Sequence, residues 1–160
     1  MTHLSWSVQL ALVPFALIYA NFIEWFFHKY ILHGMGRRRG SLWNFHWQHH
    51  HTVRRHGYLD PDYQNPFSAW KPQSKEIVAL LGGGIVHLPV LVVAPLVYLS
   101  LVWSGMRYYY VHRKSHLDLE WARKHVPWHY DHHMNRDMDA NWCVTRPWFD
   151  HLLGTRKIAD

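Results

Sequence analysis

Ten of the sixteen histidines in this 160-residue chain fall into two near-copies of one pattern. Each copy has two histidines four or five residues apart, and the second of them is followed 13 positions later by His-x-x-His-His. Composition bias alone would not give the same offsets twice, so we interpret the pattern as a duplicated set of metal ligands. The first copy is His28, His33, His46, His49 and His50, and the second is His112, His116, His129, His132 and His133.

Helix geometry suggests how these side chains meet. Residues three and four apart share a helix face, so each His-x-x-His-His triplet is expected to point one way. His112 and His116 have the i,i+4 spacing with which one helix binds one ion. His28 and His33 are five apart, which leaves their rings roughly 140° apart on an ideal helix. They either bracket a site from a helix end or a π-bulge, or serve different ions.

The number of imidazoles sets the number of metals. Ten are too many for one ion of four to six ligands, but they suit two ions with about five each, so the sequence predicts a dinuclear, nitrogen-rich centre. Imidazole suits iron, zinc and copper and makes calcium and magnesium poor candidates. The single cysteine, Cys143, excludes an all-cysteine zinc site and a disulfide within the chain.

The apolar residues are gathered into two blocks, which predict a membrane protein. Residues 4–27 are long enough to cross a hydrocarbon core, which takes about 20 residues. This block has no basic segment before it and no small-residue cleavage site, so we expect a retained span and not a signal peptide. The second block runs over residues 77–103 and continues towards residue 111.

The second block is expected to enter the membrane and return. Histidines on both sides of it must reach one site, so it should form a hairpin that bends near His87–Pro89 or at Pro95. The prediction is an all-α, multipass protein of about three spans, or one span plus a hairpin, with a helical cap that carries the dinuclear site. We expect one domain over residues 1–160, made of the span 4–27, a first histidine segment 28–75, the membrane hairpin 76–111 and a second histidine segment 112–160.

Basic residues flank the histidine side of both blocks. By the positive-inside rule this side is cytoplasmic and the N-terminus lies outside. The same rule accounts for the net charge of +6, and no nucleic-acid-binding motif is visible, so no nucleic-acid partner is expected. No feature of the sequence indicates an oligomeric state. The flanking residues are Lys29, Arg37, Arg38, Arg39, Arg54, Arg55, Lys71, Lys75, Arg107, Arg113 and Lys114.

The order of the histidine boxes resembles the fatty acid hydroxylase and sterol desaturase superfamily over residues 20–155. The tail is similar to that family's closing pattern, with Asn141 followed by Trp142, and with Trp148, Asp150 and the Gly154–Thr155 pair. The segment 28–34 (HKYILHG) also resembles the first box of bacterial carotenoid hydroxylases, which is the alternative function within the same chemistry.

The resemblance implies two iron ions, with O2 as co-substrate and the ten histidines as ligands. It also implies hydroxylation or desaturation of a membrane lipid such as a fatty acyl chain or a sterol, in a bacterial inner membrane or the endoplasmic reticulum. No flavin, haem or dinucleotide motif is present, so electrons are expected from an external donor or reductase. Cys143 in place of glycine, Phe149 between Trp148 and Asp150, and one missing span depart from the family pattern and leave the substrate class open.

Two readings from other classes remain open. The ligand set also permits a membrane zinc hydrolase, although the His-Glu-x-x-His motif that would supply a general base is missing. A purified sample could also carry zinc in place of iron. A metal transporter or buffering protein would be expected to place histidines along its spans. Here the ten cluster on one predicted side.

The remaining candidates are hydrogen-bond acceptors for the imidazoles and the other six histidines. We expect His51 to face solvent or to support a ligand, His56 and His151 to be polar cap residues, and His3 to be interfacial. His125 is an alternative ligand four residues before His129. His87 is either functional within the apolar block or lies at the hairpin tip. Acceptor candidates, with Asp131 and Asp150 ranked first, are Glu24, Asp131, Asp137, Asp139, Asn141 and Asp150.

Overall fold

The computed structural model describes residues 3–67 and 71–158, and every regular element in these ranges is a helix. This confirms the all-α prediction. In chain order the elements are α1 (Trp6–Phe26), the π-helix η1 (Phe27–Met35), the 3₁₀-helix η2 (Leu42–Asn44), α2 (Phe45–Arg55), the 3₁₀-helix η3 (Pro61–Gln64), α3 (Pro72–Val86), α4 (Leu88–Val93), α5 (Pro95–Leu117), α6 (Leu119–His125), α7 (Pro127–Met134) and α8 (Trp148–Leu152).

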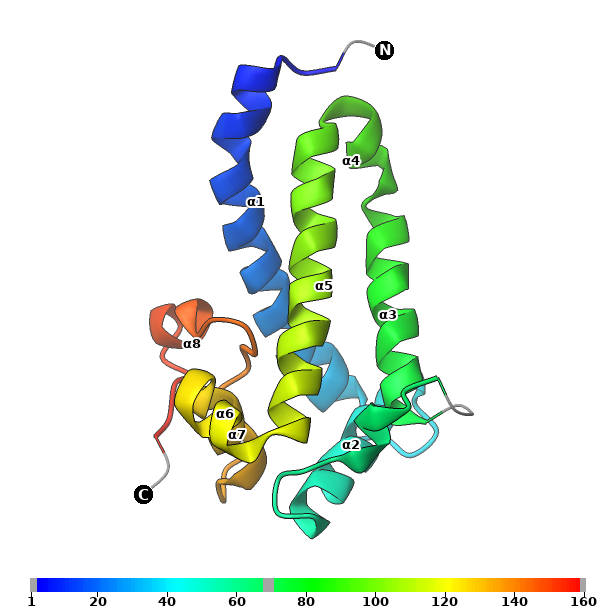
Figure 1. The fold of residues 1–160 in the computed structure, drawn as a ribbon, viewed down its shortest axis with the longest axis vertical. Helices are drawn as coiled ribbons and strands as arrows, with labels where there is room; N and C mark the ends of the chain where they lie inside the picture. The colour runs from blue at the N-terminus through cyan, green and yellow to red at the C-terminus, as the bar shows by residue number, and fades with distance from the viewer. Residues whose placement is uncertain (1–2, 68–70, 159–160) are drawn as a thin grey trace.

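Three long helices, α1, α3 and α5, run side by side along the length of the molecule (Figure 1). The chain rises along α3, turns through the short α4 and returns along α5, so that α3 and α5 form a helical hairpin. The helical run breaks at both of the places that the sequence offered as alternatives for the bend, because α4 begins directly before Pro89 and α5 begins at Pro95. His87 lies one short helix before the turn at Ala94, so it is not at the hairpin tip as the sequence allowed.

A buried glutamine joins the far ends of α1 and α5. Gln9 is fully buried in α1, and its side-chain oxygen accepts a hydrogen bond from the Leu96 backbone N–H at 3.0 Å. That N–H belongs to the first turn of α5, where no partner exists within the helix itself. The Leu4 N–H also donates to the Val93 carbonyl at 2.9 Å. These bonds fix α1 against the turn of the hairpin.

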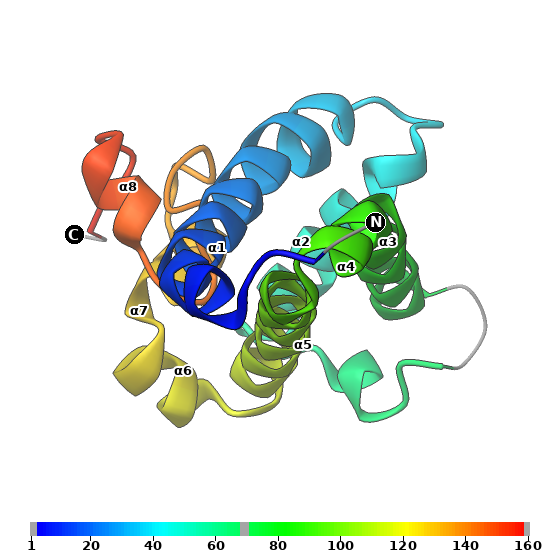
Figure 2. The same ribbon diagram turned by 90° about the horizontal axis from the view of Figure 1, so that it is seen from above.

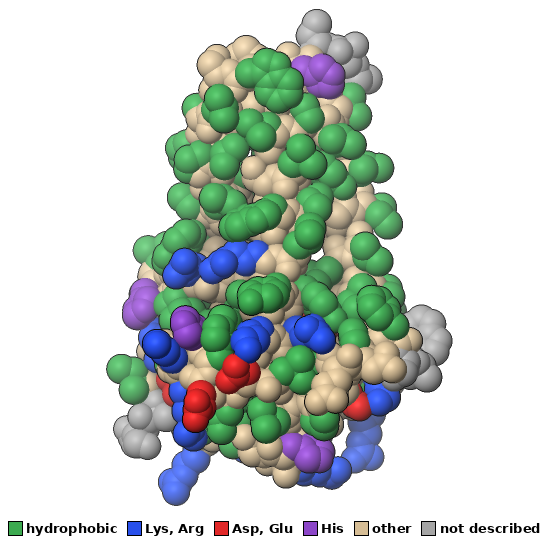
Figure 3. Space-filling model, viewed as in Figure 1, with side chains coloured by type: hydrophobic (Ala, Val, Ile, Leu, Met, Phe, Trp, Pro, Cys, Tyr) green, Lys and Arg blue, Asp and Glu red, His purple; other side chains and the backbone are tan. Residues whose placement is uncertain are grey.

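The outer surface of the long helices is apolar. Large side chains such as Phe15, Ile85 and Met106 are each about two-thirds exposed. Figure 3 shows that hydrophobic side chains cover the upper part of this face, while charged side chains gather towards the end that carries the short helices. Among the described residues one helix, Trp6–Met35, is long and apolar enough to cross a membrane. The three-pass arrangement stays a prediction.

The short helices α2, α6, α7 and α8 gather at the end of the molecule opposite α4 and form the cap (Figure 1). Seen from above, α6, α7 and α8 lie to one side of α1 and α5 (Figure 2). The packed apolar core lies in the cap, where Val53, Tyr58 and Val126 are buried together. A second small core joins Trp25 of α1 to Trp142 and Cys143 of the tail. The well-packed part of the molecule therefore surrounds the histidines.

Candidate metal centre

The π-helix explains the five-residue spacing of the first two histidines. α1 passes without a break into η1, whose wider turn brings residues five apart onto one face. His28 and His33 are consequently neighbours, with ring centroids 5.1 Å apart. Directly after η1, a Cβ on Gly36 would lie 2.0 Å from the Leu32 carbonyl oxygen, so only glycine fits the backbone there. The π-helix reading of this segment is confirmed.

Nine of the ten predicted histidines fall into two buried groups of possible ligands. Within each group the ligand atoms lie within 4.8 Å of one another. The rings of His50 and His133, one from each group, have centroids 4.2 Å apart, so the groups are adjacent. We call them cluster A, which is His28, His33, His46, His50 and His132, and cluster B, which is His49, His112, His116 and His133.

His129 is the tenth predicted histidine and lies against cluster B. Its Nε2 atom is 3.1 Å from Nε2 of His116, and its ring centroid is 4.6 Å from that of His133. It is fully buried like the others. The structure therefore brings all ten predicted side chains to one place.

The two clusters exchange one histidine each. In the first His-x-x-His-His box, His46 and His50 belong to cluster A while His49 belongs to cluster B. In the second box His133 belongs to cluster B and His132 to cluster A. In both boxes the middle histidine is the one that crosses. The histidines of each box therefore face the same region, as their spacing predicted, but they divide between the two adjacent clusters.

Carboxylates orient two imidazoles of cluster B. Asp60 accepts a hydrogen bond from Nδ1 of His49 at 2.8 Å, and Glu76 accepts one from Nδ1 of His112 at 2.6 Å. Both carboxylates are buried, and the Tyr63 hydroxyl donates to Glu76. A backbone carbonyl, that of Tyr58, accepts from Nδ1 of His116 at 3.0 Å. Such partners fix the ring and its tautomer and raise its basicity as a ligand.

Backbone carbonyls of the tail loop orient cluster A. The Trp142 carbonyl accepts from Nδ1 of His28 at 2.6 Å, and the Ala140 carbonyl accepts from Nδ1 of His132 at 2.7 Å. Between them, Asn141 has a φ of 59°, a left-handed conformation that asparagine tolerates better than most residues. Cluster A is thus aligned by the shape of a loop.

Two carboxylates, the buried Asp150 and the partly buried Glu24, hold that loop in place. Asp150 of α8 accepts hydrogen bonds from the backbone N–H groups of Trp142 and Cys143, each at 2.8 Å. Glu24 of α1 accepts from the N–H groups of Val144 and Thr145, the second at 2.7 Å. The tail is therefore tied to both α1 and α8 next to the histidines.

The donor set fits metal ions. Nδ1 of His49 and of His116 each carry a hydrogen, because they donate to a carboxylate and to a carbonyl that can only accept. In the neutral rings both Nε2 atoms then present lone pairs, yet they face each other at 3.1 Å. A cation shared by the two lone pairs removes this repulsion. His133 adds two buried nitrogens with no hydrogen-bond partner in the described ranges.

Burial keeps these imidazoles neutral, which is the state that binds metal. It lowers the pKa of His46, His50, His129 and His133 far below the ordinary value, and neighbouring histidines lower it further. Burial also lowers the pKa of His132 to about 4, although the hydrogen bond to the Ala140 carbonyl opposes this.

Two further groups near the histidines have shifted pKa values. Burial alone would raise the pKa of Asp60, but hydrogen bonds from His49, the Asp62 backbone and Gln73 outweigh it, so the pKa lies below its usual value. Asp60 is therefore an ionised acceptor beside cluster B. Burial raises the pKa of the Cys143 thiol well above its ordinary range, so this cysteine is a neutral core residue and not a thiolate ligand.

Most of the acceptors expected from the sequence form no hydrogen bond to a histidine. Asp131 pairs with Arg156 at 2.9 Å, Asp137 pairs with Lys157, and neither bonds a histidine. Asp139 is 3.6 Å from Nδ1 of His33, but it is half exposed and pairs with Arg37.

The sequence analysis did not single out Asp60 and Glu76, yet these two side chains hydrogen-bond histidines directly. Glu76 had one visible signal, since it is an acid placed where the second apolar block begins. Asn141 uses its side-chain oxygen to accept from the Lys157 N–H at 2.8 Å, within the tail.

The other histidines lie outside both clusters. His3, His51, His56, His125 and His151 are exposed, as expected of interfacial and cap residues. His125 stacks on Trp121 with ring centroids 4.8 Å apart, so the alternative that it is a ligand is wrong.

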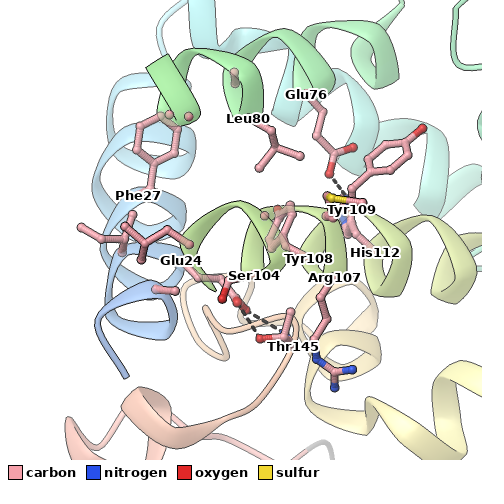
Figure 4. A pocket seen from close by; sticks show the side chains of 18 of the residues that line it. Glu24, Phe27, Glu76, Leu80, Ser104, Arg107, Tyr108, Tyr109, His112 and Thr145 are labelled. Atoms are coloured by element: carbon pink, nitrogen blue, oxygen red, sulfur yellow. Dashed lines mark hydrogen bonds and ion pairs between the residues drawn. The ribbon is translucent and has the colours of Figure 1, made fainter. Parts of the chain in front are cut away.

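A cavity of about 1130 Å³ runs from the histidines between α1, α3 and α5. His28, His46, His49 and His112 lie in its wall at the cap end. Figure 4 shows Glu76 and His112 meeting beside Leu80, and Phe27 facing the same space from η1. Most of the remaining wall is apolar. An apolar chain inside this cavity would lie against imidazoles of both clusters.

The family of the chain follows from a comparison with family models. Searches of curated proteins and of solved structures found no match. The model of the fatty acid hydroxylase family matches residues 13–155, which contain all ten clustered histidines and the tail that aligns them. Membership implies an oxidoreductase of the hydroxylase or desaturase type with buried histidine clusters able to bind metal. The chain belongs to the fatty acid hydroxylase family.

Proposed function

We propose that the protein is an O2-dependent, di-iron oxidoreductase that hydroxylates or desaturates a C–H bond of a membrane lipid. The observation that carries this proposal is the meeting of two buried histidine clusters with one apolar cavity. Four clustered histidines line that cavity, so a lipid chain inside it would reach the metal-binding atoms without passing through water.

Cluster A and cluster B would each hold one iron ion, and His129 would complete the ligands of cluster B. Bound iron would activate O2 and supply the oxidant for the C–H bond. The side chains of the protein supply alignment: Asp60 and Glu76 hold the rings of His49 and His112 through Nδ1, and this leaves Nε2 free to bind.

The apolar wall positions the substrate and excludes water. Leu80, Phe27 and Tyr108 face the cavity near the histidines (Figure 4). Packing against such side chains orients a flexible chain with one carbon next to the reactive centre, and positioning of this kind supplies much of an enzyme's rate enhancement. The same wall protects a strong oxidant from unproductive reaction with water.

The long helices would cross the membrane three times, as α1, α3 and α5. Their exposed apolar surface and the position of the charged residues support this arrangement (Figure 3). α3 has 15 residues, fewer than a full span usually needs, so α4 would lie in the membrane above it. The excess of lysine and arginine near the cap supports a metal centre on the cytoplasmic side.

Electrons would come from a separate donor that docks on the cap. Hydroxylation of a C–H bond by O2 also consumes two electrons and two protons and releases one water. The fold carries no dinucleotide or flavin motif in its sequence. An external reductase or electron carrier on the cytoplasmic side is therefore part of the proposal.

The test uses iron-loaded protein in detergent with extracted membrane lipids, ¹⁸O2 and a chemical reductant. We expect a lipid product that gains one ¹⁸O atom by mass spectrometry, or loses two hydrogens if the enzyme desaturates. His50→Ala and His133→Ala should abolish the product, while His51→Ala, on the exposed side of the same helix as His50, should retain it. If His50→Ala and His133→Ala form as much product as the wild type, the assignment of the oxidising centre is wrong.

A further inference from the structure

The cavity ends, away from the metal centre, in a group of polar side chains. Tyr19 of α1, His87 after α3 and Tyr98 of α5 all line it, among residues that are otherwise mainly apolar. In the proposed arrangement these three lie within the membrane, where polar and ionisable side chains are costly and usually functional. Neither the metal centre nor its alignment uses them.

The hydrogen bonds of His87 define what this end of the cavity offers. Nδ1 of His87 donates to the Gly83 carbonyl at 2.8 Å, because a carbonyl can only accept. In the neutral ring Nε2 is then an acceptor, and it lies 3.0 Å from the Tyr19 hydroxyl. Tyr19 must therefore donate its hydrogen to His87, which leaves only lone pairs on the phenolic oxygen.

Tyr98 repeats this arrangement on the facing helix. Its hydroxyl donates to the Gly84 carbonyl at 3.3 Å, so its oxygen also retains only lone pairs. Within the described part of the chain neither phenol has a second hydrogen-bond partner. The far end of the cavity thus presents hydrogen-bond acceptors and no free donor.

The distance to the metal centre suits a long lipid. Tyr19 and His28 are nine residues apart on one continuous helical segment, which corresponds to about 13 Å along its axis. His87 and Glu76 are eleven residues apart along α3, or about 16 Å. A polar group at the far end would therefore be separated from the reacting carbon by a long apolar stretch.

We propose that the cavity binds a lipid alcohol, with its hydroxyl donating to Tyr19 beside His87 and the carbon to be oxidised at the histidine clusters. Only a ligand that brings its own donor satisfies the Tyr19 oxygen, so an ester, ether or ketone at this end gains nothing. The inference rests on the proposed function for the identity of the reacting end, and it names the substrate class of the same site.

The test compares two probes that differ in one hydrogen-bond donor. Tritiated hexadecan-1-ol and its methyl ether, which can only accept, are bound to metal-free protein in the same detergent micelles. We expect the wild type to bind the alcohol about three- to tenfold more tightly, the range for one hydrogen bond. Equal binding of the two probes would overturn the proposal.

Two variants move this preference in different ways. The double variant Tyr19→Phe/His87→Leu removes the Tyr19 acceptor together with Nε2 of His87, which would otherwise be free to accept from the alcohol, and should weaken binding of the alcohol to the level of the ether. His87→Leu releases the Tyr19 hydrogen, so that the phenol can donate, and should strengthen binding of the ether. Tyr110→Phe makes the same change as Tyr19→Phe on an exposed side chain outside the cavity wall and should change neither affinity. An unchanged preference in Tyr19→Phe/His87→Leu would refute the assignment.

Binding and turnover separate this inference from the proposed function. If the alcohol preference depends on Tyr19 but iron-loaded protein oxidises no lipid, the proposed reaction fails and the binding site stands. If a lipid is oxidised while alcohol and ether bind alike in every variant, the reaction stands and the lipid-alcohol site is wrong.

Discussion

Cluster A and cluster B contain the same kind of ligand, but they are aligned by different kinds of partner. In cluster B the carboxylates of Asp60 and Glu76 accept hydrogen bonds from two imidazoles. In cluster A the acceptors are the backbone carbonyls of Ala140 and Trp142 in the tail loop. A carboxylate transfers more electron density to an imidazole than a carbonyl does, so cluster B should bind its metal more tightly.

The two clusters also depend on different parts of the chain for their geometry. Cluster B depends on Asp60, between α2 and α3, and on Glu76 of α3, whose side chains bond it directly. Cluster A depends on a loop that is itself held by Glu24 and Asp150. Substitutions far from the metal should therefore affect cluster A through the backbone and cluster B through charge.

The largest effect should come from testing which histidines share an ion. The double variant His49→Ala/His116→Ala removes two ligands of cluster B and should leave about one metal per chain in place of about two. His46→Ala/His49→Ala, although its two sites are three residues apart, removes one ligand from each cluster and should leave almost none. Elemental mass spectrometry measures both. If the second pair keeps one metal, the box does not divide between the clusters.

The next effect concerns the pH dependence of the metal-free protein. Burial lowers the pKa of His132 to about 4 from an ordinary value of 6.5, so between these values the unfolded chain binds a proton that the folded chain does not. Stability is therefore lost as the pH falls from about 6.5 to about 4, by roughly 3 kcal/mol from this group.

The variant His132→Gln should flatten that dependence. Urea unfolding in detergent, followed by tryptophan fluorescence at several pH values, gives the slope for the wild type and the variant. Parallel slopes would show that His132 of cluster A does not titrate as its burial requires.

A direct carboxylate partner should matter next. Glu76→Gln keeps the shape of the side chain but removes the charge beside His112, and should weaken the cluster B metal about 10- to 100-fold. Chelator competition measures the affinity of each metal. Glu120→Gln makes the same change on an exposed residue of α6 and should have no effect. If Glu76→Gln weakens the cluster A metal instead, the claim that Glu76 supports cluster B is wrong.

The tail should have a smaller effect, confined to cluster A. Asp150→Asn turns one oxygen that faces a backbone N–H into an amide, which loosens the loop at Trp142 and Cys143. Losing about one hydrogen bond should weaken the cluster A metal roughly three- to tenfold. Asp137→Asn is the matched control, since Asp137 pairs with Lys157 at the surface. An equal loss in both clusters would indicate a general loss of folding.

The smallest effect is expected at the carboxylate nearest to cluster A. Asp139 is half exposed, and its oxygen is 3.6 Å from Nδ1 of His33, too far for a hydrogen bond. Asp139→Asn should change the affinity of the cluster A metal by less than about twofold, as surface ion pairs contribute little. The same chelator competition decides it, and a tenfold loss would place a carboxylate in the support of cluster A as well.

The repeated histidine pattern was enough to predict that all ten side chains meet, because local spacing on helices carries that information. The π-helix was one of two readings of the His28–His33 spacing. The apolar block and its prolines predicted a bend at one of two places, and the helical run breaks at both. These features depend on neighbours in the chain, and sequence patterns report such neighbours well.

The crossing of His49 and His132 could not be predicted in this way. It depends on how α2 and α7 pack against the two adjacent clusters, a long-range arrangement that leaves no mark in the spacing. The backbone carbonyls that align cluster A could not be predicted either, because every residue has a carbonyl and the sequence does not mark which ones bond a histidine. Asp150, ranked first as an acceptor, was the correct residue for the tail, but it acts on the loop and reaches the histidines only through it.

The exchanged histidines also bear on how such a chain could have arisen. Each half supplies most ligands of one cluster and lends its middle box histidine to the other. A single half would therefore lack one ligand of its own site and carry one that points away from it. If the two halves descend from one shorter ancestor, that ancestor would have completed its metal sites only by pairing with a second copy of itself, and the present chain keeps that exchange within one polypeptide.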